Sequence, residues 1–244
     1  MDVPDQINHA RSLMDEKRFD EAISLLEQCE QACPGDEFVA AELAEAYSDR
    51  GYFSLRENQP DQAQKDFESA LKYSPVPEAR LGLAQFAVVA GQVAEAKDLA
   101  DRILEEHPDF FPAREFLAKI CMGKEDLAGA EEQYRQILND TPVPRVILSL
   151  VSLLEGQGRS EEALGVLSEG RLALPDEEEL ILALSRRVSS EEGWRILNQA
   201  LAGAPRSFEL WFERACIACR QNDPEEAAIS MNHCLEIDSE RTRS

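Results

Sequence analysis

The chain has 244 residues, of which 43% are hydrophobic, and this composition argues against wholesale disorder. Its net charge is −23, and the stretches 3–110, 111–207 and 208–244 are all acidic, with no cluster of Lys and Arg. Nucleic acid and anionic lipid are therefore not expected partners, because both need clustered basic side chains to neutralise phosphate. No run of 18 apolar residues occurs, so we expect no segment that spans a membrane.

The dominant pattern recurs every 30 to 41 residues, and each occurrence contains a small residue on a helix. These small residues are Ala22, Ala63, Ala96, Ala130, Ala163, Gly193 and Ala227. In six of the seven cases a larger apolar residue follows four positions later, at Leu26, Phe67, Tyr134, Leu167, Leu197 and Met231. Proline stands twelve positions after the first six small residues, at Pro34, Pro75, Pro108, Pro142, Pro175 and Pro205. Apolar residues four apart share one helix face, and proline ends a helix, so each repeat is predicted to end in an amphipathic helix.

A second helical pattern precedes each of these helices, so each repeat is predicted to be a hairpin of two helices. The predicted units lie near residues 3–36, 37–77, 78–110, 111–143, 144–175, 176–207 and 208–241. Asn58, Gly91, Gly158 and Asn222 each stand five residues before the small residue. These residue types tolerate the left-handed conformation that ends a helix, so they mark the turn inside the hairpin.

Two units depart from the common length. The second unit carries seven extra residues, Glu37 to Leu43, which we expect to lengthen its first helix by two turns. The sixth unit is about four residues short, and its second helix is predicted to begin at Ser189 because Ser189-Ser190-Glu191-Glu192 forms a capping-box pattern.

The segment from Ala44 to Pro75 resembles a tetratricopeptide repeat. Tyr47 and Gly51 match the aromatic and glycine positions of its first helix, while Ala63, Phe67, Ala70 and Pro75 match the second helix and its terminator. Trp211 and Ala215 match the aromatic and small positions of the last unit. The resemblance covers seven units and implies an all-α, right-handed superhelix, with residues 1–244 in a single solenoid domain.

No pattern of catalytic residues is found, so we expect no enzyme and no cofactor. The chain contains no phosphate-binding glycine loop, no dinucleotide fingerprint and no HExxH or GxSxG motif. Cys216 and Cys219 form a CxxC motif, followed by His233 and Cys234. A zinc site is disfavoured because the CxxC motif lies within a helix, and adjacent residues on a helix point about 100° apart. Packing of small cysteines is preferred over metal binding and over a redox role, both of which stay open.

The resemblance implies that the first helix of each unit lines a concave, partner-binding surface. The candidate partner-binding residues are Arg11, Tyr52, Gln85, Lys119, Ser152 and Phe212, and Ile7 and Leu81 are among the apolar residues expected near the same lining. Each of these residues has the alternative role of packing between hairpins.

The predicted function is a protein–protein interaction scaffold that binds a segment of another protein, and the chain is expected to be a monomer. One alternative is a scaffold that self-assembles through the ends of the solenoid; another is a regulatory subunit of an enzyme complex. The expected compartment is the cytoplasm, because the N-terminal residues show no secretion signal and six cysteines occur without one.

Overall fold

The computed structural model describes residues 3–241, and the side chains of residues 3–239. Helices make up 81% of the described residues and no strand occurs among them, which confirms the all-α prediction. The chain divides into two compact units, Met1–Asp126 (unit 1) and Leu127–Ser244 (unit 2). The assignment of the whole chain to a single domain stays a prediction.

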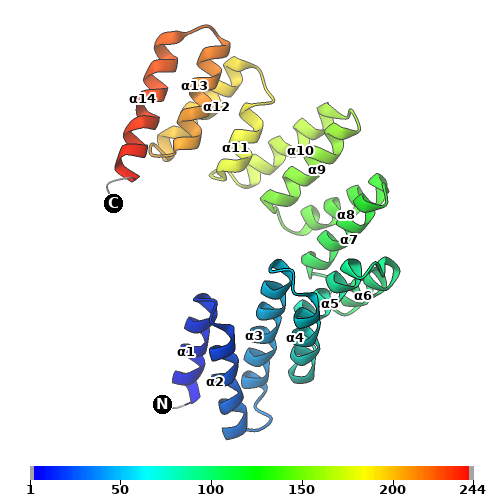
Figure 1. Cartoon of the computed structure of the whole chain (residues 1–244). Helices are drawn as coiled ribbons and strands as arrows, with labels where there is room; N and C mark the ends of the chain where they lie inside the picture. The colour runs from blue at the N-terminus through cyan, green and yellow to red at the C-terminus, as the bar shows by residue number, and fades with distance from the viewer. Residues whose placement is uncertain (1–2, 242–244) are drawn as a thin grey trace. The chain divides into compact units, whose positions relative to one another are not determined.

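Fourteen helices are described, in the order shown in Figure 1. In unit 1 they are α1 (Val3–Asp15), α2 (Phe19–Ala32), α3 (Glu37–Arg56), α4 (Pro60–Tyr73), α5 (Pro77–Val89), α6 (Val93–Glu106) and α7 (Phe111–Gly123). In unit 2 they are α8 (Leu127–Asp140), α9 (Pro144–Gly156), α10 (Ser160–Ala173), α11 (Glu178–Ser185), α12 (Ser190–Gly203), α13 (Phe208–Arg220) and α14 (Pro224–Arg241).

The odd-numbered helices are termed first helices here, and within each unit three of them form one layer. In unit 1, α1 contacts α3 and α3 contacts α5; in unit 2, α9 contacts α11 and α11 contacts α13. The even-numbered second helices make their extensive contacts with first helices, for example α4 with both α3 and α5. Within the two units, five second helices (α2, α4, α6, α10 and α12) therefore lie between the first helix of their own hairpin and that of the next.

The repeated small and large residues fill the spaces between hairpins. Ala63, Phe67 and Ala70 of α4 are fully buried, and the Phe67 ring lies between α3 and α5. Glycine stands at both contact points, because a Cβ atom on Gly51 or Gly82 would lie 2.6 Å or 2.3 Å from the ring. The packing of one aromatic ring against two glycines thus joins three helices.

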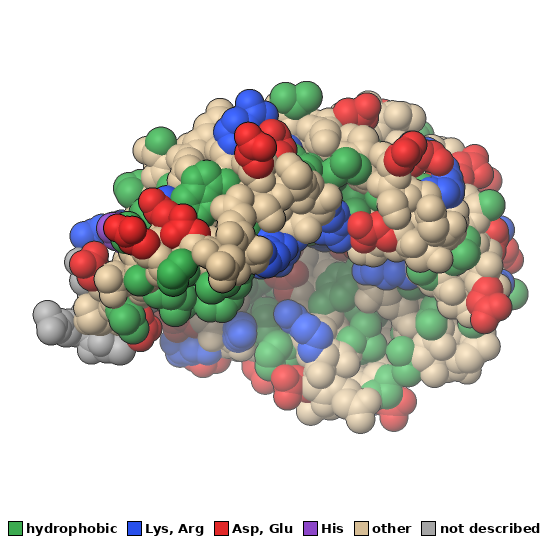
Figure 2. All heavy atoms as spheres, turned by 90° about the horizontal axis from the view of Figure 1, so that it is seen from above, with side chains coloured by type: hydrophobic (Ala, Val, Ile, Leu, Met, Phe, Trp, Pro, Cys, Tyr) green, Lys and Arg blue, Asp and Glu red, His purple; other side chains and the backbone are tan. Residues whose placement is uncertain are grey.

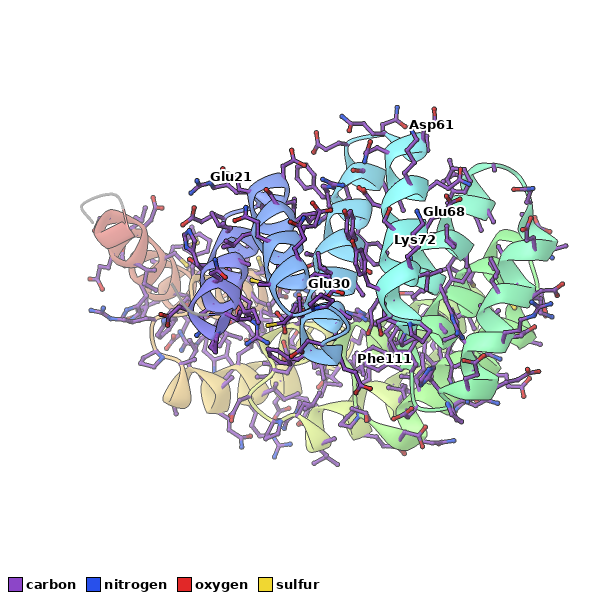
Figure 3. All side chains as sticks on the ribbon, turned by 90° about the horizontal axis from the view of Figure 1, so that it is seen from below. Glu21, Glu30, Asp61, Glu68, Lys72 and Phe111 are labelled. Atoms are coloured by element: carbon purple, nitrogen blue, oxygen red, sulfur yellow. The ribbon has the colours of Figure 1, made fainter. Side chains whose placement is uncertain are left out.

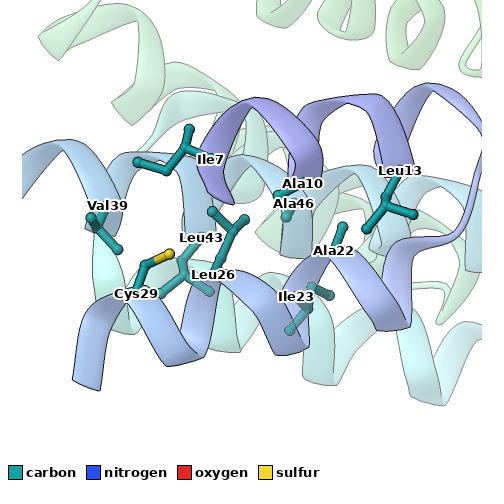
Figure 4. Packing of buried hydrophobic residues seen from close by; sticks show 10 residues of the cluster. All are labelled: Ile7, Ala10, Leu13, Ala22, Ile23, Leu26, Cys29, Val39, Leu43 and Ala46. Atoms are coloured by element: carbon teal, nitrogen blue, oxygen red, sulfur yellow. The ribbon is translucent and has the colours of Figure 1, made fainter. Parts of the chain in front are cut away.

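The first core of unit 1 joins α1, α2 and α3, and Figure 4 shows its ten buried residues. Ile7 of α1 and Cys29 of α2 pack there with Val39 and Leu43 of α3. Val39 belongs to the seven extra residues of the second unit, so the two added turns of α3 extend this core. Asp36 begins the helix, because its Oδ1 accepts hydrogen bonds from the Phe38 and Val39 amides at 2.9 and 3.2 Å.

The predicted left-handed turn residues are confirmed, with φ of 58° at Asn58, 79° at Gly91, 75° at Gly158 and 57° at Asn222. Lys17 and Glu125 adopt the same conformation at the same place in their hairpins, with φ of 61° and 60°. A side chain with a Cβ atom costs about 1–2 kcal/mol in this conformation. The hairpin geometry therefore determines the turn, and the residue type is secondary.

The sixth hairpin is built differently because α11 has only eight residues. Ser189 caps α12, since its Oγ accepts a hydrogen bond from the Glu192 amide at 3.3 Å, as predicted. A Cβ atom on Gly193 would lie 2.7 Å from the Ser185 carbonyl oxygen. This close contact between α11 and α12 explains why glycine replaces alanine at this point of the repeat.

Candidate functional site

The six candidate partner-binding residues all lie on first helices. Arg11, Tyr52, Gln85 and Lys119 belong to α1, α3, α5 and α7 of unit 1, while Ser152 and Phe212 belong to α9 and α13 of unit 2. Over residues 3–239, no hydrogen bond or ion pair joins two of them. Their role in binding stays a prediction. Lys119 pairs with Glu115 of its own helix, with 3.1 Å between Nζ and Oε1.

Arg11 is exposed, but its guanidinium group already pairs with a carboxylate of the same unit. Its Nε donates to Glu42 Oε2 at 2.8 Å and its NH2 group donates to Glu42 Oε1, so the pair is bidentate. The guanidinium also lies over the Phe38 ring, 5.6 Å from its centre. Because the Glu42 side chain is only 5% exposed, Arg11 neutralises a nearly buried carboxylate.

Tyr52 is half-buried between α3 and α5. Its hydroxyl donates to the Glu78 carbonyl oxygen at 2.7 Å, and its ring meets the Phe67 ring edge-on at 5.1 Å. Burial and, to a lesser degree, the nearby Glu78 and Asp49 raise the pKa of Tyr52 above its ordinary value. Tyr52 therefore packs against the next hairpin, which is the alternative left open by the sequence.

Beside Tyr52 lies a group of carboxylates that we term the acidic face, formed by Glu45 and Asp49 of α3 and Glu78 of α5. Burial raises the pKa of Glu45, and the neighbouring Glu42 and Asp49 raise it further. Burial also raises the pKa of Asp49, Arg56 lowers it, and Glu78 raises it. The first-helix layer of unit 1 thus concentrates negative charge.

Two apolar residues expected near the lining belong instead to the cores. Ile7 and Leu81 are each 3% exposed, and they pack in the cores around α1 and α5. For these two residues, packing between hairpins, the alternative left open by the sequence, is therefore the role that their burial supports.

In unit 2, we term Arg186, Phe212, Glu213 and Arg220 the arginine face. Arg186 follows α11 directly, and its Nε donates to Glu213 Oε2 at 2.7 Å. Arg220, at the end of α13, donates to Glu213 Oε1 at 3.4 Å. The Glu213 side chain is 7% exposed, whereas those of Arg186 and Arg220 are 54% and 49% exposed. One nearly buried carboxylate therefore holds two half-exposed guanidinium groups.

Neighbouring residues extend this layer along α9, α11 and α13. Arg187 donates to both Glu155 carboxylate oxygens, at 2.7 and 3.0 Å, and to the Ala183 carbonyl oxygen at 2.9 Å. Hydrogen bonding to Arg187 lowers the pKa of Glu155. Phe212 is 45% exposed and stacks on Phe208, with the ring centres 6.1 Å apart. The layer thus combines ion pairs with an exposed aromatic side chain.

The sequence analysis missed Arg186 because the sixth unit is short. Tyr52, Gln85, Lys119 and Ser152 each stand eleven residues before the small residue of their repeat. The same count from Gly193 reaches Leu182, whereas Arg186 is only seven residues away. Counting forward from the start of the first helix, instead of backward from the second helix, would have found it.

The outward surface carries charge of both signs. On the face that Figure 2 shows, acidic side chains are dispersed, with Lys and Arg among them. On the second helices of unit 1, Glu21 projects from α2, and Asp61, Glu68 and Lys72 project from α4 (Figure 3). This dispersed charge suits solubility and marks no site.

The cysteine and histidine residues of the last hairpin have separate partners. His233 stacks on Trp211 with ring centres 4.0 Å apart, whereas the Cys234 thiol lies 3.7 Å from the Phe208 carbonyl oxygen. Burial raises the pKa of the Cys216 thiol. Among the described residues, no group of three or more His, Cys, Asp and Glu side chains is arranged to hold a metal ion.

Two family models described as tetratricopeptide repeat match the chain. One matches residues 54–120 and 90–147, and the other matches residues 208–241, so that together they cover more than half of it. The chain belongs to the tetratricopeptide repeat family. Membership supports a general role as a protein–protein interaction scaffold.

Solved structures show the same fold. Yeast Tom70 is 14% identical, with a TM-score of 0.63 over 97% of this chain and 61% of that one. The C-terminal part of a tetratricopeptide repeat-containing protein from Cytophaga hutchinsonii is 15% identical, with a TM-score of 0.59 over 96% and 95% of the two chains. Pseudomonas aeruginosa PilF is 15% identical, with a TM-score of 0.55 over 82% and 99%. No curated protein matches the sequence.

Proposed function

We propose that this tetratricopeptide repeat protein is a non-catalytic scaffold that binds a segment of another protein on its first-helix layers. The observation that carries this proposal is the arginine face, where one carboxylate holds two half-exposed arginines and the adjacent residue on the same helix, Phe212, is an exposed aromatic. Aromatic and arginine side chains are the residue types that contribute most to binding between proteins. Because the helices are ordered beforehand, binding requires little ordering of this chain.

No described helix has the length and apolar character needed to cross a membrane. All six cysteines are free thiols, which suits a reducing compartment, and we therefore retain the cytoplasm as the expected location.

A second candidate function is self-association through α14. Met231 and Leu235 on this helix are 39% and 63% exposed, whereas Leu26 and Phe67, which stand at the same point of the repeat as Met231, are fully buried. The net charge of −23 opposes association of two copies, so we retain the monomer as the expected state.

A pair of matched variants tests the scaffold proposal. Phe212 on α13 and Leu172 on α10 are both large, exposed apolar residues, at 45% and 78% exposure. We expect Phe212→Ala to weaken capture of the partner from native lysate by about tenfold, as for one residue at the centre of an interface. Leu172→Ala, on a second helix, is expected to leave capture unchanged.

Capture is measured by quantitative mass spectrometry of proteins retained on the immobilised variants, after circular dichroism has shown that both are folded. Loss of the partner with Leu172→Ala together with full capture by Phe212→Ala would place the interface on the second helices and contradict the proposal.

A further inference from the structure

Arg186 and Arg220 use fewer of their donors than Arg11 and Arg187, and they differ from the singly bonded Arg80 in sharing one carboxylate. Arg11 donates two hydrogen bonds to one carboxylate, and Arg187 donates three hydrogen bonds. Arg186 and Arg220 each donate one hydrogen bond, both to Glu213. A guanidinium group has five N–H donors, so four remain on each of the two residues.

The buried arginine of the same hairpin makes the contrast clearer. Arg214 lies 4.0 Å from the centre of the Trp194 ring and donates to Asn198, Ser230 and Glu226. Its side chain is 10% exposed, so its contacts serve packing. The arginines at 186 and 220 have about half of their side-chain surface in solvent, where their remaining donors are accessible.

The position of Glu213 suits it to hold these two side chains. Removing a carboxylate from water is costly, and an ion pair with half-exposed arginines offsets this cost only in part. The benefit is geometric, since one carboxylate fixes two flexible side chains beside each other before any partner arrives. Two guanidinium groups and one carboxylate leave a net charge of about +1 in an otherwise acidic chain.

We propose that Arg186 and Arg220 form a subsite for a carboxylate on an aspartate or glutamate side chain of the partner, with Phe212 on the same helix as Glu213 providing a separate apolar contact. This inference rests on the proposed scaffold function and names the chemistry of the segment that the arginine face accepts. A carboxylate carries the single charge that balances the net charge of the face. A phosphate group carries about −1.5 to −2 at neutral pH and would leave negative charge uncompensated beside Glu213.

The subsite is tested directly by NMR titration of the arginine Nε–H signals in the intact protein. The probe is N-acetyl-glutamate amide, whose only charge is the side-chain carboxylate, at constant ionic strength. We expect the signals of Arg186 and Arg220 to shift and saturate with a Kd of about 1–10 mM, typical of a few kcal/mol of binding free energy. N-acetyl-glutamine amide, which lacks the charge, should leave both signals unchanged.

Arg195 on α12 provides the matched control, because it is 76% exposed and also pairs with one glutamate, Glu192. Its signal should not saturate over the same range. A linear response at all three arginines would show that the probe acts only through general screening, and would overturn the subsite. A tighter response to inorganic phosphate, or to the terminal carboxylate of N-acetyl-glycine, would overturn the assignment to a side-chain carboxylate.

Partner capture separates the two proposals. We expect the double variant Arg186→Gln/Arg220→Gln to weaken capture by about tenfold or more, while its melting temperature confirms that it folds. If Phe212→Ala weakens capture and the double variant does not, the scaffold proposal stands and the carboxylate subsite is wrong. If neither variant affects capture, the arginine face is not the binding surface.

Discussion

Replacing Gly82 by alanine should lower the free energy of unfolding by about 3 kcal/mol, at the upper end of the range for overpacking a core. The new Cβ atom would lie 2.3 to 2.5 Å from three carbons of the Phe67 ring, which is fully buried. The ring has little room to move, because Gly51 approaches it closely and Tyr52 contacts it edge-on. Urea denaturation followed by circular dichroism measures the change.

Gly165 provides the control for this substitution. It lies in the middle of α10, and a Cβ atom added there would meet no atom within 4 Å. Gly165→Ala should therefore raise stability by about 0.5–1 kcal/mol through helix propensity alone. If Gly82→Ala also raised stability, this result would contradict the close packing of the Phe67 ring against α5.

Replacing Arg50 by methionine should cost about 3–5 kcal/mol, because it leaves a buried carboxylate without its positive partner. The Asp66 side chain is 2% exposed, and Arg50 donates to both of its oxygens, at 3.1 and 2.6 Å. Methionine keeps much of the length of the side chain, so the loss reports charge more than volume. Thermal and urea unfolding of the variant measure the cost.

A double variant tests whether the loss of stability comes from the unpaired charge of Asp66. In Arg50→Met/Asp66→Asn the buried group is neutral and still close to Gln62, which donates to Asp66 Oδ1 at 3.0 Å. The double variant should recover at least half of the lost stability. Arg195→Met, at an exposed ion pair, should have no measurable effect. Equal losses in the single and double variants would show that the Asp66 charge is not the cause.

The fold could be predicted from the sequence because the repeat places the same residue types at the same points of each hairpin. Proline two residues beyond the end of a helix, as at Pro75 after Tyr73, and a left-handed residue such as Asn58 both act locally. Local signals of this kind do not depend on the rest of the chain. Lys17 and Glu125 carry no such signal, since their conformation is imposed by the hairpins that they join.

The candidate site was less accessible to sequence reasoning because charge pairing is not periodic. Glu213 pairs with Arg186 of the preceding hairpin, 27 residues away, and Glu42 pairs with Arg11 across 31 residues. Counting along a regular repeat predicts where a residue lies on its helix, but it does not predict which basic side chain pairs with a given carboxylate. The shortened sixth unit moved Arg186 out of that count altogether.

Amide hydrogen exchange of the complex with its captured partner tests most directly where binding occurs. If the first helices bind the partner, exchange should slow in α9, α11 and α13 relative to the free protein, with little change in α10 and α12. In the Arg186→Gln/Arg220→Gln variant, the slowing around residues 186 and 220 should disappear. Slowed exchange confined to the second helices, with α9, α11 and α13 unchanged, would contradict the proposal that this protein binds through its first-helix layers.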